Sequence, residues 1–240
     1  CTIIKLLMQV LIDVRLLSRG GTSGIEEYTR HLTNELLTID QSNEYSFFYN
    51  GLRKEPLNLN VAPRLRSGTK IIDWHMPNKV FDFSSRFLGW PKIDKIIKTD
   101  LVFSPHFNIL KTAAVPRVIT FHDLSFLRHP YFFSARQKFW HWLQGVKQQA
   151  LAADHLIAVS EFTKNDLVNL LGIPPEKISV VYSGISENLK ITSKPTTLNP
   201  KPQILYLGTL EPRKNVPALI RAFNILKQRP EFHDWQLVIA

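Results

Sequence analysis

HLIAVSEFTKNDLVNLLGIPPEKISVVYSG, residues 155–184, contains a strand, a helix and a second strand in close succession. The apolar run 155–159 is typical of a buried strand, and Ser160 follows it as a side-chain cap for the next helix. Gly172 ends that helix, and the run 178–182 predicts another strand. A helix that connects two strands usually leaves them parallel. This stretch therefore predicts an α/β fold with a parallel sheet.

The same alternation continues through most of the chain before residue 190. Ser23 and Glu26 have the spacing of a capping box, which predicts the start of the first helix. Residues 51–97 contain scattered Pro, Gly and aromatic residues and predict only short elements. The whole pattern predicts a Rossmann-like doubly wound parallel sheet, in which ligands bind beyond the carboxyl ends of the strands. Further expected elements are strands at 9–14, 45–49, 101–104 and 117–121 and a long helix at 134–152.

A change of composition marks a second unit near the C-terminal end. Residues 190–202, KITSKPTTLNPKP, are polar and rich in Pro and Thr, and they predict an interdomain linker. A single strand–helix–strand pattern fills the rest of the chain, and such a unit is too small to bury its own faces. We therefore predict a domain at 1–189, a linker, and the incomplete start of a second Rossmann-like domain at 203–240.

Charge and cysteine content restrict the function classes. The formal net charge is +10 and the sequence pI is about 9.7, which suits phosphate-bearing ligands or an anionic membrane surface. The basic residues are spread along the chain apart from a short cluster at 91–98, so nucleic-acid binding is not favoured. The single cysteine, Cys1, excludes an internal disulfide and fits a reducing, cytoplasmic compartment. No apolar run approaches the roughly 18 residues of a membrane span.

QILYLGTLEPRKN, residues 203–215, predicts a phosphate-binding turn in the second unit. Gly208 follows a strand, and Arg213 and Lys214 lie where the next helix is expected to begin. A helix N-terminus carries unpaired N–H groups and a partial positive charge. An Arg and a Lys beside it would make a strong diphosphate site.

The sequence GGTSG, residues 20–24, joins the first strand to the first helix. Its glycines, Gly20, Gly21 and Gly24, would let the backbone approach a ligand, and the helix end attracts anions. The loop lacks the G-x-G-x-x-G pattern, and two glutamates in the first turn would repel a phosphate. A capped helix after a flexible turn explains the motif as well as ligand contact does.

His122 and Asp123 end the strand expected at 117–121. A neutral imidazole there could hydrogen-bond a sugar hydroxyl or a phosphate, a charged one could pair with phosphate, and Asp123 could orient the ring. The alternative is a histidine packed at a strand end beside a structural carboxylate. The position at the ligand-binding edge favours function. Other strand ends carry His106, Ser160 and Gly184.

The stretch FFSARQKFWHWLQ, residues 132–144, combines aromatic and cationic side chains and could form a helix that lies on a membrane surface. Helical core spacing relates four positions here: Phe139, Trp142, Leu143 and Val146. We therefore expect most of these aromatic side chains to face the sheet instead.

Metal and nucleophile sites find little support in the sequence. The eight histidines are scattered without ligand spacing, no Asp-x-Asp pair is present, and no G-x-S-x-G motif occurs. We expect no metal site and no metal cofactor.

Several stretches, taken together and in order, resemble one enzyme family. They are GGTSGIEEYTRHL, DLVFSPHF, VITFHDLSF, ADHLIAVSEFTKNDL, KISVVYSGI and LYLGTLEPRKN. The ordered set resembles the retaining glycosyltransferases of family four (group 1), which have the GT-B fold. The form GTLEPRKN looks most like bacterial mannosyltransferase-like enzymes of surface-polysaccharide assembly. The resemblance implies two Rossmann-like domains that face each other across a cleft, the N-terminal one for the acceptor and the C-terminal one for the nucleotide-sugar donor.

The resemblance also implies roles for particular residues. His122 would contact the transferred sugar or its phosphate. From its position beside His122, we expect Asp123 to be the second catalytic residue. Cationic side chains would neutralise the leaving diphosphate in place of a metal ion. The implied co-substrate is a nucleoside diphosphate sugar carrying a hexose such as mannose or glucose, and the acceptor is a saccharide or a lipid-linked saccharide. The implied donor-binding residues are Gly20, Gly21, Gly24, Gly208, Arg213 and Lys214.

Two features depart from the family pattern. Thr209 stands where many members have an arginine, so Arg213 is expected to supply that charge. The family's Glu-x7-Glu motif is expected beyond Ala240, because Glu27 and Glu35 have the spacing but lie on the first helix of the acceptor domain. We therefore expect an N-terminal fragment that is nearly inactive alone.

Other readings stay open. The chain could be a non-catalytic binding module built on half of the fold, or part of another GT-B enzyme such as a nucleotide-sugar epimerase. The basic surface allows peripheral contact with the inner face of a membrane, as a lipid-linked acceptor would require.

Overall fold

The computed structural model describes residues 7–20, 23–52, 57, 69–184 and 201–240. The chain divides into two compact units, residues 1–186 and 187–240. Most of the predicted linker, residues 190–200, lies outside the described residues. None of the described helices is both long enough and apolar enough to cross a bilayer.

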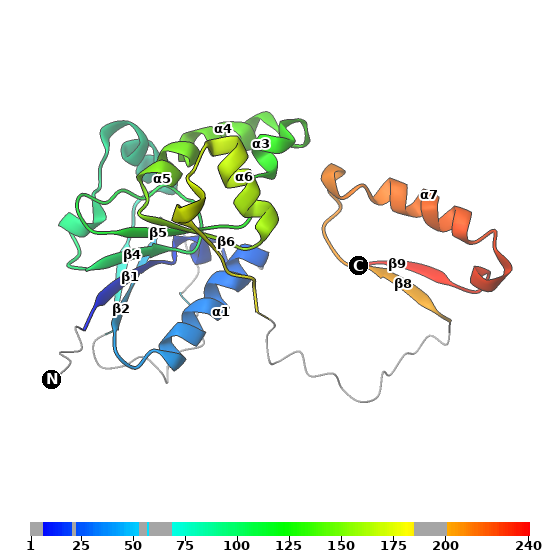
Figure 1. The fold of residues 1–240 in the computed structure, drawn as a ribbon, viewed down its shortest axis with the longest axis horizontal. Coiled ribbons are helices and arrows are strands. Elements are labelled where there is room, and N and C mark those ends of the chain that lie inside the picture. Colours follow the sequence, from blue (N-terminus) through cyan, green and yellow to red (C-terminus); the bar gives the residue numbers. More distant parts are fainter. Residues whose placement is uncertain (1–6, 21–22, 53–56, 58–68, 185–200) are drawn as a thin grey trace. The chain divides into compact units, whose positions relative to one another are not determined.

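The first unit is built on a sheet of seven parallel strands in the order β3-β2-β1-β4-β5-β6-β7 (Figure 1). The chain runs outward from β1 in one direction through β2 and β3, and in the other direction from β4 to β7. The order therefore reverses between β1 and β4, which confirms the predicted doubly wound α/β fold. The strands are β1 (Gln9–Asp13), β2 (Glu44–Asn50), β3 (Lys70–Trp74), β4 (Leu101–Ser104), β5 (Arg117–Phe121), β6 (His155–Ala158) and β7 (Ile178–Val180).

Helices cover both faces of this sheet, and their N-terminal caps follow the sequence signals. Ser23 and Glu26 form the predicted capping box, in which the Ser23 N–H donates to Glu26 Oε2 at 2.8 Å. Ser160 Oγ accepts from the Thr163 N–H at 3.1 Å. The helices are α1 (Gly24–Ile39), α2 (Asn78–Phe83), α3 (Ser125–Arg128), α4 (Ala135–Gln144), α5 (Val146–Ala152) and α6 (Glu161–Leu171). Shorter helical turns are η1 (Arg15–Arg19), η2 (Ser84–Leu88), η3 (Ile93–Lys95), η4 (Pro130–Phe132) and η5 (Pro175–Lys177).

Strand alternation explains which helices lie on which face. Ile12 and Phe47 point to the face that α1 covers, where Leu37 of α1 is buried with them. Leu11 and its neighbours on the other face pack against α2 and, further along the sheet, against α5 and α6. Figure 1 shows α1 on the opposite side of the sheet from α4 and α5.

The long helix predicted at 134–152 is wrong, because the chain forms two helices there. Gly145 has a φ of +59° and caps the end of α4, with its N–H donating to Trp142 O at 3.1 Å. A glycine adopts this left-handed conformation without the steric cost that other residues pay, so it stops the helix. A Cβ at this position would also lie 2.8 Å from Arg86 Nη1.

The prediction that the aromatic side chains of α4 face the sheet is wrong for two of them. Phe139 is 61% exposed and Trp142 is 54% exposed, whereas Leu143 and Val146 are buried. Residues 135–139 are all exposed, so α4 packs on the body of the unit mainly through its C-terminal end. Helical spacing identifies an apolar face, but it does not say whether another element covers that face.

The second unit contains one strand–helix–strand motif. It comprises β8 (Gln203–Tyr206), the turn η6 (Pro212–Lys214), α7 (Val216–Leu226), the turn η7 (Pro230–Phe232) and β9 (Gln236–Ile239). The two strands pair in parallel, with Gln203 opposite Gln236. Val216 is the one buried hydrophobic side chain in the described part of this unit. Most of its apolar surface is therefore exposed, as expected for a unit of this size.

Candidate active site at the carboxyl edge of the sheet

His122, the residue after β5, is held by contacts from three other segments. Its Nε2–H donates to Pro105 O, after β4, at 2.9 Å. The ring of Tyr28 on α1 meets the imidazole edge-on, with centroids 4.7 Å apart. Thr163 Oγ1 on α6 donates to His122 O at 3.1 Å. The ring is thus fixed in place at the edge where ligands bind in doubly wound sheets.

Burial determines the protonation state of His122. Burial lowers its pKa, and the hydrogen bond to Pro105 and the charge of Asp123 only partly oppose that shift. The ring is therefore neutral at neutral pH, and the Pro105 carbonyl places its proton on Nε2. Nδ1 is then a hydrogen-bond acceptor. It suits a sugar hydroxyl, which can donate, better than a phosphate oxygen, which only accepts.

Asp123 has a different partner from the one expected. Its Oδ1 accepts hydrogen bonds from the Ser125 N–H at 2.9 Å and from Ser125 Oγ at 2.6 Å, at the start of α3. No hydrogen bond joins it to His122 in the described part of the chain. Pro105 therefore orients the imidazole, and Asp123 acts on it through charge alone.

A buried ion pair lies at the carboxyl end of β1, where the strand order reverses, and joins Asp13, the last residue of β1, to Arg15. The Arg15 guanidinium donates two parallel hydrogen bonds to the Asp13 carboxylate, from Nε to Oδ1 at 2.8 Å and from Nη2 to Oδ2 at 2.7 Å. Arg15 Nη2 also donates to Ile109 O at 2.9 Å. Burial opposes the Asp13 charge, but Arg15 and His106 outweigh it and hold the Asp13 pKa below its usual value.

His106, after β4, is buried against this pair with one ring nitrogen unsatisfied. Its Nδ1 accepts from the Asn108 N–H at 3.3 Å. Its Nε2 has no hydrogen-bond partner among the described residues, and it lies 3.9 Å from Asp13 Oδ1. Burial lowers the His106 pKa to about 4, so the ring is neutral at neutral pH.

Arg117 adds a second buried cation without a carboxylate partner among the described residues. Burial lowers its pKa to about 9, which leaves it charged at neutral pH. Asp13, Arg15 and Arg117 therefore carry one net positive charge beneath the carboxyl edge of the sheet. The guanidinium of Arg117 donates to Ser104 Oγ, Asn108 O, Leu110 O and Gln149 Oε1.

The sequence indicated only part of this cluster. His106 was expected at a strand end, whereas Asp13, Arg15 and Arg117 were missed. No spacing rule links Arg15 to residues after β4, because the contact depends on which strands are neighbours in the sheet.

The buried His106 makes a prediction about acid stability. Its pKa is about 4 in the folded chain and about 6.5 when exposed, so the unfolded state binds a proton first as the pH falls. Above about pH 6.5, the neutral His106 makes its full contribution to the unfolding free energy. As the pH falls from about 6.5 to about 4, this contribution decreases by at most about 1.4 kcal/mol per pH unit. His106→Asn keeps an acceptor for the Asn108 N–H and removes the titration.

We expect the unfolding free energy of His106→Asn to fall less between about pH 7 and about pH 5 than that of the wild type. Urea unfolding at the two pH values measures the difference. Some pH dependence should persist, because burial also lowers the pKa of His122 and of His141. His155→Asn, at the amino end of β6, is the matched control. Equal pH slopes for wild type and His106→Asn would contradict the prediction.

The glycine loop after β1 is described in part. Gly20 adopts a left-handed conformation with φ +63°, and its N–H donates to Leu17 O at 3.3 Å. Gly21 lies outside the described residues. Gly24 begins α1, and a Cβ there would have no neighbour within 4 Å. The capping box of Ser23 and Glu26 confirms the predicted start of α1, and contact of the glycines with a ligand stays a prediction.

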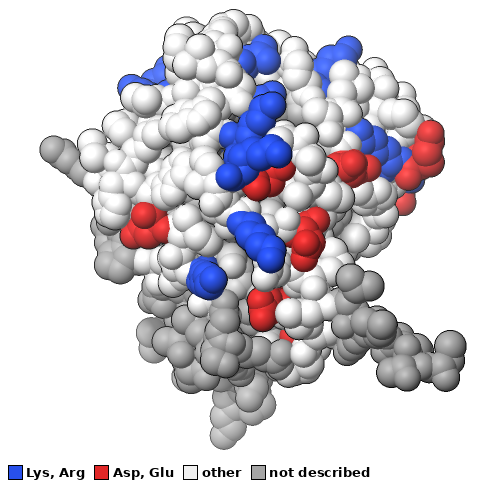
Figure 2. All heavy atoms as spheres, turned by 90° about the vertical axis from the view of Figure 1, so that its left-hand side faces the viewer, with Lys and Arg blue, Asp and Glu red and all other residues white. Residues whose placement is uncertain are grey.

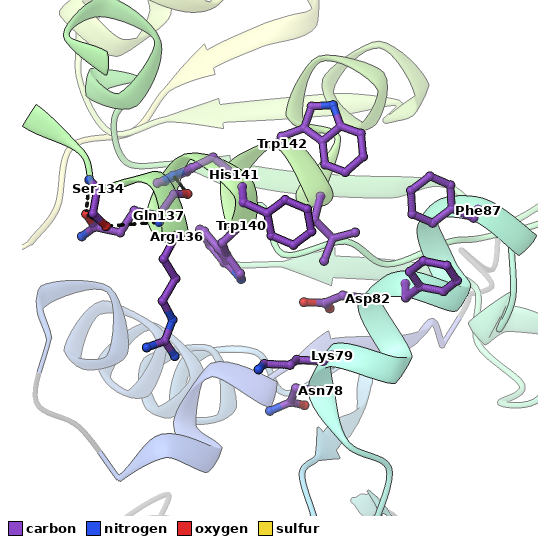
Figure 3. Close-up of a pocket in the computed structure, with 13 residues that line it drawn as sticks. Asn78, Lys79, Asp82, Phe87, Ser134, Arg136, Gln137, Trp140, His141 and Trp142 are labelled. Atoms are coloured by element: carbon purple, nitrogen blue, oxygen red, sulfur yellow. Dashed lines mark hydrogen bonds between the residues drawn. The ribbon is translucent and has the colours of Figure 1, made fainter. Parts of the chain in front are cut away.

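An open groove lies between α2 and α4 (Figure 3), and the sequence analysis did not predict it. Its volume is about 1210 Å³. Gln144 Nε2 at the end of α4 donates to Asp82 Oδ2 on α2 at 2.9 Å and ties the two walls together. The aromatic and cationic stretch 132–144 was the sequence signal, but core spacing favoured the wrong interpretation. Besides Asp82, the groove is lined by Asn78, Lys79, Phe83, Phe87, Ser134, Arg136, Gln137, Phe139, Trp140, His141, Trp142 and Leu143.

Comparison with known proteins identifies the fold family. The family model described as Glycosyltransferase Family 4 matches residues 22–189. This chain belongs to glycosyltransferase family 4. The match covers α1 to β7 and includes His122, the end of β4 and both walls of the groove, and it confirms the predicted resemblance.

Individual relatives of this family 4 chain agree with that assignment. O-antigen chain mannosyltransferase B of Escherichia coli is 26% identical over 118 residues, which are 45% of this chain and 30% of that protein. The apo structure of the lipopolysaccharide outer core galactosyltransferase WaaB has a TM-score of 0.53 at 18% identity, over 96% of this chain and 60% of that one. A glycosyltransferase from Rickettsia africae ESF-5 gives 0.52 at 18% identity, over 98% and 60%. This chain thus spans 60% of the length of those two structures.

The predicted phosphate turn of the family 4 chain differs from expectation in its geometry. Arg213 and Lys214 lie in η6, and Asn215, with φ +49°, separates that turn from α7. Pro217 has no N–H, and the Ala218 N–H donates to Asn215 O at 2.9 Å, so the first turn of α7 offers few donors to an anion. The two cations therefore stand before the helix, not on it.

The charge of this turn is also partly neutralised. Arg213 Nε pairs with Glu211 Oε2 at 2.7 Å, and this pair and Thr209 lower the Glu211 pKa. Gly208 has φ +152°, and its N–H donates to Ala240 O at 3.0 Å. Lys214 makes no side-chain hydrogen bond or ion pair with the described residues. Donor binding by Gly208, Arg213 and Lys214 stays a prediction.

Surface charge on the first unit is mixed on the side shown in Figure 2, where Lys and Arg lie among Asp and Glu. That face lacks the continuous basic stripe typical of nucleic-acid binding. Within the described residues, no group of three or more His, Cys, Asp or Glu side chains is placed to hold a metal ion.

Proposed function

We propose that this protein is a retaining glycosyltransferase that moves a hexose from a nucleoside diphosphate sugar to a saccharide or lipid-linked acceptor. The observation that carries the proposal is His122, fixed at the carboxyl edge of a family 4 domain with Nδ1 left as an acceptor. In this role Nδ1 accepts a hydrogen bond from a hydroxyl of the transferred sugar. That contact positions the sugar without adding charge next to the donor phosphates.

The donor side of the proposal rests on the resemblance and on the second unit. Gly20, Gly21 and Gly24 would line the cleft near the donor phosphates, and Gly208 would let the backbone approach them. Arg213 and Lys214 would meet the charge that develops on the leaving diphosphate. Cations in this role make a metal ion unnecessary, so we propose metal-independent transfer. The likeness to an O-antigen chain mannosyltransferase favours mannose as the hexose.

A donor screen with product analysis tests the proposal. The protein expressed from its complete gene is incubated with GDP-mannose, UDP-glucose and related donors, and nucleotide release is measured with and without chelator. We expect one donor to be used, equally well with chelator, and NMR of the product to show the anomeric configuration of the donor. Inversion at the anomeric carbon would contradict retention. Interconversion of a nucleotide sugar without acceptor would favour an epimerase, and no release from any donor would favour a binding module.

A further inference from the structure

The groove between α2 and α4 is chemically polarised along its length. On α2 and the turn η2 that extends it, Lys79 is followed by Phe83 and Phe87 at intervals of four residues. On α4, Arg136 is followed by Phe139 and, three residues later, by Trp142. All six of these side chains line the groove, so each wall presents a cation near its start and aromatic rings further along.

The aromatic rings form one continuous exposed cluster. Phe83 and Phe87 have ring centroids 4.7 Å apart, Phe87 and Trp142 are 6.0 Å apart, and Phe139 and Trp142 are 5.6 Å apart. All four side chains are more than half exposed. A cluster of this kind on a folded domain marks a binding surface for an apolar partner.

The two cations are available to an anion. Lys79 and Arg136 make no hydrogen bond or ion pair with any described residue, and in Figure 3 both side chains extend into the space between α4 and α2. Asp82 opposes this charge, but it is hydrogen-bonded by Gln144 and interacts with the buried Arg15, whose cluster with Asp13 and Arg117 carries one net positive charge. The cationic end therefore favours a phosphate.

The direction of the groove relates it to His122. Helices that follow strands of a parallel sheet start at its carboxyl edge and run back toward its amino edge. α2 follows β3, and α4 follows β5 and precedes β6, so Lys79 and Arg136 lie at the helix ends nearer the carboxyl edge. The aromatic cluster lies further from that edge. An amphiphile in the groove would thus point its head toward the residues expected to handle the sugar.

We propose that this groove binds the acceptor as an amphiphile, with a phosphate or diphosphate between Lys79 and Arg136 and a hydrocarbon chain on the aromatic cluster. Its volume of about 1210 Å³ exceeds the roughly 300–1,000 Å³ of sites for drug-sized ligands, which suits a long chain. The inference rests on the proposed function, because it names the acceptor class of that reaction. It assigns one wall of the ligand site to the aromatic and cationic stretch 132–144 and the other wall to side chains of 78–87 that the sequence did not single out.

Binding of farnesyl phosphate, measured below its micellar concentration, tests the proposal. Two partial probes accompany it: farnesol has the hydrocarbon chain without the phosphate, and inorganic phosphate has no chain. Calorimetric titration of the protein from its complete gene gives the three affinities. We expect farnesyl phosphate to bind at least about tenfold more tightly than either partial probe. Equal affinities for farnesyl phosphate and inorganic phosphate, or for farnesyl phosphate and farnesol, would overturn the proposal.

Two double variants separate the ends of the groove. Lys79→Ala with Arg136→Ala should weaken farnesyl phosphate by at least about tenfold and leave farnesol within about twofold. Phe83→Ala with Phe139→Ala should weaken both chain-bearing probes. All four side chains are exposed, so the unfolding midpoints should match the wild type. A matched pair of exposed cations outside the groove, Lys138→Ala with Lys147→Ala, should change nothing, and an equal loss there would overturn the proposal.

Binding to lipid vesicles tests the alternative, in which a membrane surface and not a single amphiphile occupies the groove. If the protein bound phosphatidylglycerol vesicles through these residues but not dispersed farnesyl phosphate, the groove would be a membrane-docking surface and the proposal would fail.

Failure of the proposed function gives a different result from failure of the groove proposal. Intact farnesyl phosphate binding without sugar transfer from any donor would refute transfer alone. Transfer to a water-soluble saccharide without farnesyl phosphate binding would refute the groove alone.

Discussion

Replacing Asp13 with alanine should lower the unfolding free energy of the first unit by about 3–5 kcal/mol. The two side-chain hydrogen bonds from Arg15 to Asp13 are short, at 2.8 and 2.7 Å, the Arg15 N–H adds a third at 3.2 Å, and both side chains are buried. Asp13→Ala leaves the Arg15 guanidinium charged in the interior beside Arg117, with Ile109 O as its remaining acceptor. The cost is mainly that of an uncompensated buried charge, not that of the lost hydrogen bonds.

A double variant distinguishes this cause from loss of packing. Asp13→Leu with Arg15→Met removes both charges and keeps apolar contact with Phe81, whose ring centroid lies 4.4 Å from the Arg15 guanidinium carbon. We expect the double variant to lose less than about 2 kcal/mol, well below the single variant, because no unpaired charge remains.

Urea unfolding measured by tryptophan fluorescence in a Trp235→Phe background reports on the first unit alone, since the other four tryptophans lie before residue 187. A loss below about 1 kcal/mol for Asp13→Ala would contradict the prediction, as would a double variant that is less stable than the single one.

Replacing His122 with alanine should reduce kcat/KM for sugar transfer by about 100-fold, if the proposed function holds. The loss should appear mainly in kcat, because a positioning contact to the transferred sugar is used most fully in the transition state. The neutral ring accepts through Nδ1, and alanine removes that acceptor. Steady-state kinetics with the donor identified by the screen measure both constants.

Two variants control for structural damage at His122. His122→Gln can still donate to Pro105 O, so it should fold with the wild-type midpoint and still lose most of the activity, since it lacks the ring acceptor at the Nδ1 position. His155→Ala removes a histidine from the amino end of β6 and should stay within about twofold of the wild type. An activity of His122→Ala within twofold of wild type would refute a sugar contact through this residue.

The parallel α/β architecture could be predicted because its signals are local. Ser23 with Glu26, Ser160 and Gly172 mark helix ends through contacts within a few residues, and each lies where the spacing indicated. The error at Gly145 has the same origin. Its left-handed conformation is an intrinsic option for glycine, but a single glycine inside a periodic pattern does not show whether that option is used.

The sequence predicted where His122 lies in the fold, but it did not predict which residues contact it. His122 was placed correctly at the carboxyl edge of the sheet, because a strand end is visible in the sequence. Pro105, Tyr28 and Thr163, which hold it, come from three other segments of the chain. The adjacent Asp123 was the expected partner, but its carboxylate accepts hydrogen bonds from the N–H and the hydroxyl of Ser125 instead.

The ordered motifs of the sequence determined the family. The sequence by itself also determined most strands and helices outside residues 51–97, although not the break at Gly145, and the strand ends at which function was to be sought. These follow from periodicity and capping, which act over one or two turns of chain. The tertiary structure alone decided that Arg15 reaches Ile109, 94 residues away, and that the aromatic face of α4 meets α2 across an open groove. The reason is physical: strand order and the exposure of a helix face depend on which elements become neighbours, and no local spacing encodes that choice.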